Sequence, residues 1–330
     1  MRAPAFWRNE RPGLLARALA PIGAVYGAAT ARRMARRGEQ VSIPVVCVGN
    51  FVVGGAGKTP TAIAVARALR AAGERVAFLS RGYGGEMHAA PLLVDPQRHS
   101  ARVVGDEPLL LARVAPCYVG ADRVAAARAA IEACASVLVM DDGLQNPQLV
   151  KDFSIAVIDG EARFGNGLCL PAGPLRAPLQ AQAPFVDALV VIGGEAPQSL
   201  ASITPGRPLF AARLSADATA ASQLVGRSVL AFAGIARPDK FFASLEGIGA
   251  HVARKRAFPD HHPFRAAEIA ALLAEADKHG LIAVTTEKDR VRFPPGFSDE
   301  VVTLPVRLGF DDASSFSRRL REALAAARKR

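Results

Sequence analysis

A glycine-rich run that ends in lysine and threonine, residues 54–59, has the composition of a phosphate-binding loop. It lies between an apolar run expected to be a strand (45–48) and a segment expected to be a helix (60–72), which is the context such a loop needs. Backbone N–H groups of the loop would face phosphate oxygens, Lys58 would supply charge to the transferred phosphoryl group, and the Thr59 hydroxyl would bind Mg²⁺. The consensus has glycine at position 52, where this chain has valine. The predicted nucleoside-triphosphate site comprises Val52, Val53, Gly54, Gly55, Ala56, Gly57, Lys58 and Thr59, and Lys58 is also a catalytic candidate.

A pair of carboxylates, Asp141 and Asp142, follows directly after the apolar run 137–140. An acidic residue that leaves a buried strand beside a phosphate loop can hold Mg²⁺ directly or through water. Two aspartates before a glycine are also ordinary turn residues, which is the alternative interpretation. We predict the Mg²⁺ ligands among Thr59, Asp141, Asp142 and Glu107.

Asp106, in the Gly-Asp-Glu-Pro run at 105–108, has two interpretations. Its side chain could cap the helix that follows, with Pro108 in the first helical turn. It could instead accept a proton from a substrate hydroxyl at a loop–helix junction. The spacing alone favours the cap.

His261 lies beside a second histidine and between two prolines, in the segment 258–264. Adjacent histidines with an aspartate could ligate a metal, although no partner ligands lie nearby, or they could form a solvated turn. A histidine delivered from a second domain could also orient a general base or stabilise charge during transfer. The basic segment 163–176 could contact phosphate or be an ordinary loop.

The composition limits the class of protein. The chain has 330 residues, of which half are hydrophobic, and this excludes disorder and disulfide-dependent miniproteins. Lysine and arginine total 41 against 30 acidic residues, for a net charge of +11. This excess suits phosphate or anionic headgroups, unless it only reflects compositional bias. The four cysteines are widely spaced, which favours a reduced cytosolic compartment and argues against a zinc site.

The N-terminal segment 1–40 is predicted to be an amphipathic helix. Between residues 14 and 29 apolar side chains recur at three- and four-residue spacing, Pro21 is an expected kink, and arginines flank the stripe. No apolar run reaches the roughly 18 to 20 residues that a spanning helix needs. The helix is therefore expected to lie on an anionic bilayer surface or, alternatively, to pack on its own domain.

Strand and helix patterns alternate from residue 41 onward, which is typical of a doubly wound, mostly parallel α/β sheet. We predict a P-loop NTPase-like core at 41–200 and a smaller C-terminal α/β domain at 226–330. The less regular region 201–225 is rich in Ala, Ser, Pro and Thr and is the predicted linker.

Ten short motifs, in this order along nearly the whole chain, resemble those of the tetraacyldisaccharide 4′-kinase (lipid A 4′-kinase) family. They are VGN (48–50), GGAGKTP (54–60), SRGYG (80–84), GDEP (105–108), DDGLQ (141–145), VIDG (157–160), RFGNG (163–167), LPAGPLR (170–176), FPDH (258–261) and TTEKD (285–289). Each motif is weak by itself, whereas the ordered set is specific to the family.

The resemblance implies transfer of a phosphoryl group from ATP, with Mg²⁺, to the 4′-hydroxyl of a tetraacylated glucosamine disaccharide 1-phosphate. It implies a catalytic Asp–His pair, which falls on Asp106 and His261 and reverses the preference for a cap at Asp106. It also implies a peripheral enzyme on the cytoplasmic face of the bacterial inner membrane. The expected partners are the acylated lipid and the membrane surface, with no nucleic acid and no obligate protein partner.

The chain departs from the family pattern at two positions. Many members have histidine at the position of Asn146, so no role is assigned to that residue. Members often have glutamate at the position of Ala177, so any acidic contact there is lost or replaced. The competing interpretation is a P-loop ATPase of the partitioning or metal-insertion type, although many of those have lysine where this chain has Val53. A guanine-specific GTPase is disfavoured by the spacing of residues 286–289, and a non-catalytic membrane-associated nucleotide sensor would not need Asp106 or His261.

Overall fold

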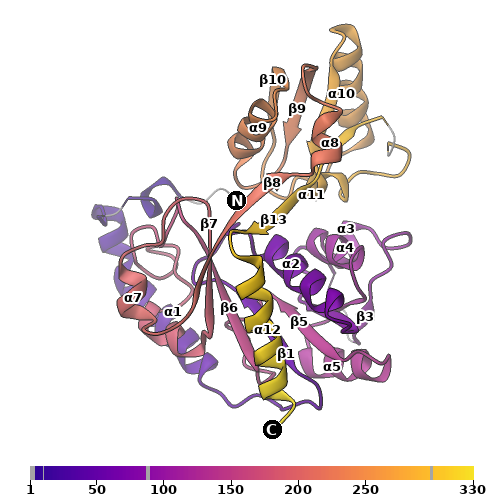
Figure 1. The fold of residues 1–330 in the computed structure, drawn as a ribbon. Helices are drawn as coiled ribbons and strands as arrows, with labels where there is room; N and C mark the ends of the chain where they lie inside the picture. The colour runs from indigo at the N-terminus through magenta and orange to yellow at the C-terminus, as the bar shows by residue number, and fades with distance from the viewer. Residues whose placement is uncertain (1–3, 10, 87–89, 298–299) are drawn as a thin grey trace.

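The computed structural model describes residues 4–9, 11–86, 90–297 and 300–330. Within these ranges the chain forms a nine-stranded and a four-stranded sheet. We call the nine-stranded sheet and its helices the large unit (residues 14–216 and 306–327), and the four-stranded sheet and its helices the small unit (residues 218–304). Figure 1 shows the small unit standing at one end of the large unit. The predicted α/β class, with a mostly parallel doubly wound sheet and a second, smaller α/β unit, is confirmed.

The large sheet has the spatial order β13-β8-β7-β6-β1-β5-β2-β4-β3. Its strands are β1 (Val45–Gly49), β2 (Val76–Ser80), β3 (Leu92–Leu93), β4 (Cys117–Val119), β5 (Val137–Asp141), β6 (Phe153–Asp159), β7 (Ala188–Ile192), β8 (Leu209–Ala216) and β13 (Val306–Phe310). Neighbours are parallel except for the pairs β13–β8 and β3–β4. Strand β1 lies between β6 and β5, where the order of the strands changes direction. Ligands of such sheets bind beyond the carboxyl ends of the strands at this point.

Helices cover both faces of the large sheet. They are α1 (Leu14–Met34), α2 (Lys58–Ala71), α3 (Ala101–Val104), α4 (Asp106–Ala112), α5 (Arg123–Glu132), α6 (Leu179–Gln182), α7 (Ser199–Ile203) and α12 (Ala313–Ala327), with short 3₁₀ turns at Ala5–Trp7 and Ala183–Phe185. Val46 and Val48 of β1 pack in the core beneath α2, α4 and α12, whereas Val45 and Cys47 pack in the core beneath α5 and the end of α1. Burial on both faces explains why the central strands are continuous apolar runs in the sequence.

The small sheet is parallel, in the order β10-β9-β11-β12. Its strands are β9 (Ser228–Ala233), β10 (His251–Ala257), β11 (Ile282–Thr286) and β12 (Val302–Leu304), and its helices are α8 (Ala218–Ser222), α9 (Pro238–Gly247), α10 (Ala266–Lys278) and α11 (Glu287–Arg290). Phe241 and Leu245 of α9 pack on one face, and Ile269 and Leu272 of α10 pack on the other. The small unit therefore has a hydrophobic core of its own on each side of its sheet.

The region 201–225 differs from the predicted linker. It contains β8, which pairs with β7 of the large sheet, and α8 of the small unit. The C-terminal residues also differ from the prediction, because β13 pairs with β8 and α12 packs on the large unit. Phe310 of β13 stacks on Phe316 of α12 with ring centroids 3.8 Å apart. Strand β8 and strand β13 thus connect the two units as an antiparallel pair (Figure 1).

Helix α1 is longer than the predicted stripe and contains Pro21 in its interior. Its glycines face the segment that carries Cys169: a Cβ on Gly23 would lie 2.7 Å from the Cys169 carbonyl oxygen, and a Cβ on Gly27 would lie 2.7 Å from the Cys169 Sγ. Glycine at these positions allows the helix to approach the protein closely. The large apolar side chains Leu14, Leu15, Ile22, Val25 and Tyr26 are exposed. By length and composition α1 is also apolar enough to cross a membrane, which the count of uninterrupted apolar residues did not indicate.

Candidate active site

The loop between β1 and α2 has the backbone that phosphate binding requires. Gly57 precedes the first residue of α2 with φ of +85°, and Gly54 has φ of +110°. Both values lie in the region that favours glycine. A Cβ built on Gly54 or Gly55 would meet nothing within 4 Å, so this part of the loop has open space beside it. The N-terminus of α2 therefore faces the carboxyl edge of the sheet with room for an anion.

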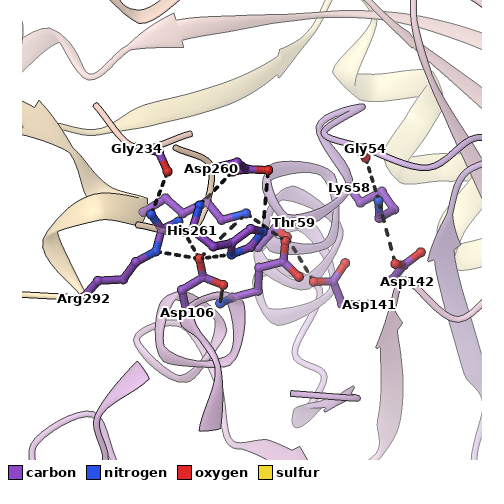
Figure 2. Close-up of polar contacts among 12 residues, drawn as sticks. Gly54, Lys58, Thr59, Asp106, Asp141, Asp142, Gly234, Asp260, His261 and Arg292 are labelled. Atoms are coloured by element: carbon purple, nitrogen blue, oxygen red, sulfur yellow. Dashed lines mark hydrogen bonds and ion pairs between the residues drawn. The ribbon is translucent and has the colours of Figure 1, made fainter. Parts of the chain in front are cut away.

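Lys58 and Thr59, the first residues of α2, contact the acidic end of β5 (Figure 2). Lys58 Nζ donates to the Gly54 carbonyl oxygen (3.1 Å) and lies 3.8 Å from Asp142 Oδ2. Thr59 Oγ1 donates to Asp141 Oδ2 (3.1 Å). Burial lowers the pKa of Lys58, and the nearby Asp142 carboxylate offsets part of that effect. A phosphate group would give this buried ammonium a further anionic partner.

Val52 and Val53, which are predicted to line the nucleotide, contact the segment 174–176 through their backbones. The Val53 N–H donates to the Pro174 carbonyl oxygen (2.8 Å), and the Val52 carbonyl oxygen accepts from Arg176 Nε (3.1 Å). These two hydrogen bonds hold the segment 174–176 against the loop. This pairing brings Arg176, in the basic segment that the sequence left without a role, to Asp142, with Nη2 and Oδ2 2.8 Å apart.

Asp141 and Asp142 are adjacent but have different surroundings. Burial acts to raise the pKa of Asp142, but the cations Lys58 and Arg176 outweigh it and leave that pKa lowered. Burial raises the pKa of Asp141 to about 7, and the Glu107 and Asp142 carboxylates add to the increase. The Oδ1 atom of each aspartate is buried and has no hydrogen-bond partner within the described ranges.

These carboxylate oxygens without partners fit a Mg²⁺ ion. Mg²⁺ in phosphoryl-transfer sites takes one or two protein oxygens and completes its shell with water and phosphate. Thr59 Oγ1 and Asp141 Oδ2 lie together as such a pair, and a cation beside them would offset the burial and the neighbouring negative charges that raise the pKa of Asp141. Glu107 instead forms an ion pair with Lys288 (3.2 Å). Among the residues that the structure describes, no three His, Cys, Asp or Glu side chains form a group that could hold a metal ion.

Asp106 is the first residue of α4, and its carboxylate contacts both the α4 backbone and the small unit. Its Oδ1 accepts from the next backbone N–H, of Glu107 (2.9 Å), while its Oδ2 accepts from Arg292 and lies 3.0 Å from His261 Nδ1. Burial acts to raise the pKa of Asp106, but the hydrogen bond from His261 and the charges of Lys288 and Arg292 outweigh it and hold the pKa well below its ordinary value. Asp106 is therefore a carboxylate held in its charged form.

His261 follows β10 of the small unit and reaches Asp106 of the large unit (Figure 2). Its φ is +58°, and its backbone N–H donates to the Gly234 carbonyl oxygen (3.0 Å). Its Nε2 lies 3.8 Å from Asp260 Oδ2, beyond hydrogen-bond distance. His262 points elsewhere and pairs with Glu268 at 3.2 Å. The two histidines thus separate into one that reaches the large unit and one that packs within the small unit.

The sequence did not indicate two cations at this junction, Lys288 and Arg292. Lys288 Nζ lies 3.2 Å from Glu107 and 3.9 Å from Asp106, and Arg292 Nη2 lies 2.6 Å from Asp106 Oδ2. Lys288 belongs to the TTEKD motif, which carried the resemblance without a role. Arg292 lies outside all ten motifs, so no pattern in the sequence pointed to it.

A phosphate loop at the carboxyl edge of a doubly wound sheet, with paired aspartates on the neighbouring strand, defines a P-loop nucleotide-binding protein. The sequence model of the family described as tetraacyldisaccharide-1-P 4′-kinase matches residues 15–325, so this chain belongs to that family. The predicted resemblance and the kinase class are confirmed, and the competing ATPase interpretation is not favoured.

Relatives and a solved structure agree with this assignment. A tetraacyldisaccharide 4′-kinase of Methylobacterium sp. (strain 4-46) is 59% identical over 325 residues, which cover 97% of each chain. One of Rhodopseudomonas palustris (strain BisB5) is 49% identical over 334 residues, covering 99% of this chain and 98% of the relative. A crystal structure of LpxK from Aquifex aeolicus in complex with ATP matches with a TM-score of 0.73 and 25% identity, over 94% of this chain and 100% of that one.

Proposed function

We propose that this protein transfers the γ-phosphoryl group of ATP to the 4′-hydroxyl of a tetraacylated glucosamine disaccharide 1-phosphate. The family and its relatives supply the reaction class. The observation that carries the proposal is the 3.0 Å contact between Asp106 Oδ2 and His261 Nδ1, which joins the two units beside the phosphate loop. A P-loop ATPase that hydrolyses nucleotide has no need of this pair.

The geometry favours His261 over Asp106 as the group that accepts the proton of the sugar hydroxyl. Asp106 is kept ionised and uses Oδ2 to accept from Nδ1 of the imidazole, which fixes the ring and its tautomer. His261 Nε2 then presents its lone pair to the acceptor hydroxyl. A hydroxyl is a poor nucleophile at neutral pH, and a positioned base typically contributes about 10²- to 10⁴-fold to such a reaction.

Lys58, Thr59 and Asp141 serve the nucleotide in this proposal. Lys58 supplies positive charge to the β- and γ-phosphates, where electrostatic stabilisation does most of the catalytic work. Thr59 and Asp141 would hold the Mg²⁺ that accompanies ATP, with Asp142 oriented by Arg176 beside them. The metal would supply neutralisation of the developing phosphate charge.

The exposed apolar face of α1 is proposed to rest on the inner-membrane surface from the cytoplasmic side. Its small-residue face packs on Cys169, and the large apolar side chains of the opposite face are exposed among the described residues. Arginines before and after the helix suit anionic headgroups. This position would place the active site near a lipid acceptor whose acyl chains stay in the bilayer.

The experiment that tests the proposal is a phosphorylation assay with the full chain. Purified protein, ATP, Mg²⁺ and the tetraacylated disaccharide 1-phosphate in mixed micelles should give a product heavier by one phosphoryl group by mass spectrometry. A 4′-deoxy analogue of the lipid is the matched control and should give none. ATP hydrolysis without a phosphorylated lipid would favour the ATPase interpretation instead.

A further inference from the structure

We infer that Arg292 is a positioning residue that holds the Asp106–His261 pair together across the two units. This inference rests on the proposed function and adds a residue to it. Arg292 belongs to the small unit, whereas Asp106 begins α4 of the large unit. Arg292 Nε and Nη2 both reach Asp106 Oδ2, at 2.9 and 2.6 Å. The two side chains are 5% and 3% exposed, so the contact is protected from solvent.

The same guanidinium also fixes the backbone that carries His261. Arg292 Nη1 donates to the Gly234 carbonyl oxygen at 2.8 Å, and that oxygen also accepts from the His261 N–H at 3.0 Å. One carbonyl group thus links the arginine to the histidine, and one carboxylate oxygen links both to Asp106. Figure 2 shows Arg292 and His261 both reaching Asp106, with Gly234 beyond Arg292.

Asp289 sets the orientation of Arg292 within the small unit. Arg292 Nη1 lies 3.0 Å from Asp289 Oδ1, which also accepts from the Gly234 N–H (2.9 Å). Asp289 Oδ2 accepts from Thr286 Oγ1 (2.6 Å), and the Asp289 side chain is fully buried. This gives a role to the TTEKD motif: its last residue braces the arginine that reaches the other unit.

The contacts require the planar, five-donor fork of arginine. Arg292 directs Nε and Nη2 at one acceptor, Asp106, and Nη1 at Gly234 and Asp289 on the other side. A lysine ammonium is a single point charge and cannot span acceptors this far apart. Lysine at this position would keep the charge but lose the link between Asp106 and the His261 backbone.

The experiment compares Arg292→Lys and Arg292→Met with Arg256→Lys, a control in which an exposed arginine of the small unit pairs with Glu275. Arg292→Met removes the hydrogen bonds to the Asp106 carboxylate, and such charge-assisted bonds are stronger than those between neutral groups. If these bonds hold the catalytic pair in place, kcat should fall about 10- to 100-fold in Arg292→Met and less in Arg292→Lys. The KM for ATP should stay within about twofold, because Arg292 contacts none of the loop residues. The control should match the wild type.

A double-mutant cycle with Asp106→Asn separates positioning from a general structural role. If Arg292 acts through Asp106, then Asp106→Asn/Arg292→Met should be scarcely slower than Asp106→Asn alone. Multiplicative losses, or a kcat of Arg292→Met within about twofold of the wild type, would overturn the inference. If Arg292→Met does not fold, judged by circular dichroism and thermal unfolding, the same cycle with Arg292→Lys decides. An inactive wild type, or an active His261→Ala variant, would instead contradict the proposed function.

Discussion

Replacing Asp141 with asparagine should stabilise the metal-free protein, and the gain should increase with pH. The Asp141 carboxyl is buried beside two other carboxylates, and its pKa is raised from 3.8 to about 7. Between these two values the folded protein binds a proton at this site that the unfolded chain has released. Stability therefore falls as pH rises through this window, because folding must then keep a proton or bury a charge. Asparagine has almost the same shape and never ionises.

The size of the effect follows from the pKa change. A difference of about three units corresponds to about 4 kcal/mol at full ionisation, at about 1.4 kcal/mol per unit. At pH 8 the wild type carries nearly all of this penalty, whereas at pH 5 it carries about 2 kcal/mol. We expect Asp141→Asn to be more stable by about 4 kcal/mol at pH 8 and by about 2 kcal/mol at pH 5. The pH-dependent part, about 2 kcal/mol, is the diagnostic quantity.

The assay is urea unfolding of both proteins at pH 5, 6, 7 and 8, with EDTA and without nucleotide. Asp142→Asn is the matched control, because the cations Lys58 and Arg176 lower the pKa of that neighbour. Its removal should destabilise the protein at pH 8, the opposite sign, since two cations lose their shared partner. Parallel stability curves for the wild type and Asp141→Asn across this pH range would refute the reasoning. Added Mg²⁺ should stabilise the wild type and have little effect on Asp141→Asn.

Three further outcomes are expected. Lys58→Ala should abolish phosphoryl transfer while the circular dichroism spectrum stays that of the wild type, and near-normal turnover in a folded variant would contradict the phosphate-loop assignment. Deleting residues 1–38 should move much of the protein from the vesicle pellet to the supernatant. High salt should do so in part, because it screens the attraction between exposed charges and the membrane surface. If the truncated protein still pellets fully with vesicles, the anchor lies elsewhere. Asp106→Ala and His261→Ala should each lower turnover by about 10² or more with ATP binding little changed, and the double variant should be scarcely worse, whereas multiplicative losses would mean that they act separately.

Local features of the fold and site were predictable because they depend on neighbours in sequence. Buried parallel strands are apolar throughout, so β1 and β5 are visible in the sequence, as is the loop from Gly54 to Thr59 between a strand and a helix. Parallel strands end at the same edge of a sheet, which brings Asp141 to Thr59 from 82 residues away. The sequence therefore indicated that the loop 54–59 and Asp141 lie together at this edge of the sheet.

The contact between Asp106 and His261 was not accessible to the same reasoning. Asp106 and His261 are 155 residues apart and lie in different units, so their pairing was inferred from the family resemblance and not from spacing. Spacing favoured a cap at Asp106, and the structure explains why that expectation was plausible: Asp106 does begin a helix and does accept from a backbone N–H. The sequence around Arg292 shows only its i,i+3 partner Asp289, because its other partners, Asp106 and Gly234, are distant in sequence.

The boundary between the units was not predicted for a related reason, and this boundary determines how the small unit is joined to the large unit. Strand β8 lies near the edge of the large sheet and most of its side chains are exposed, so it lacks the apolar pattern of a buried strand and resembles a linker. Its partner β13 arrives only after the whole small unit has been completed. The small unit is therefore an insertion held at both ends by one antiparallel pair, which restricts how it can turn relative to the large unit. The units are thus joined by this strand pair through the chain and by the His261 and Arg292 side chains, which both contact Asp106.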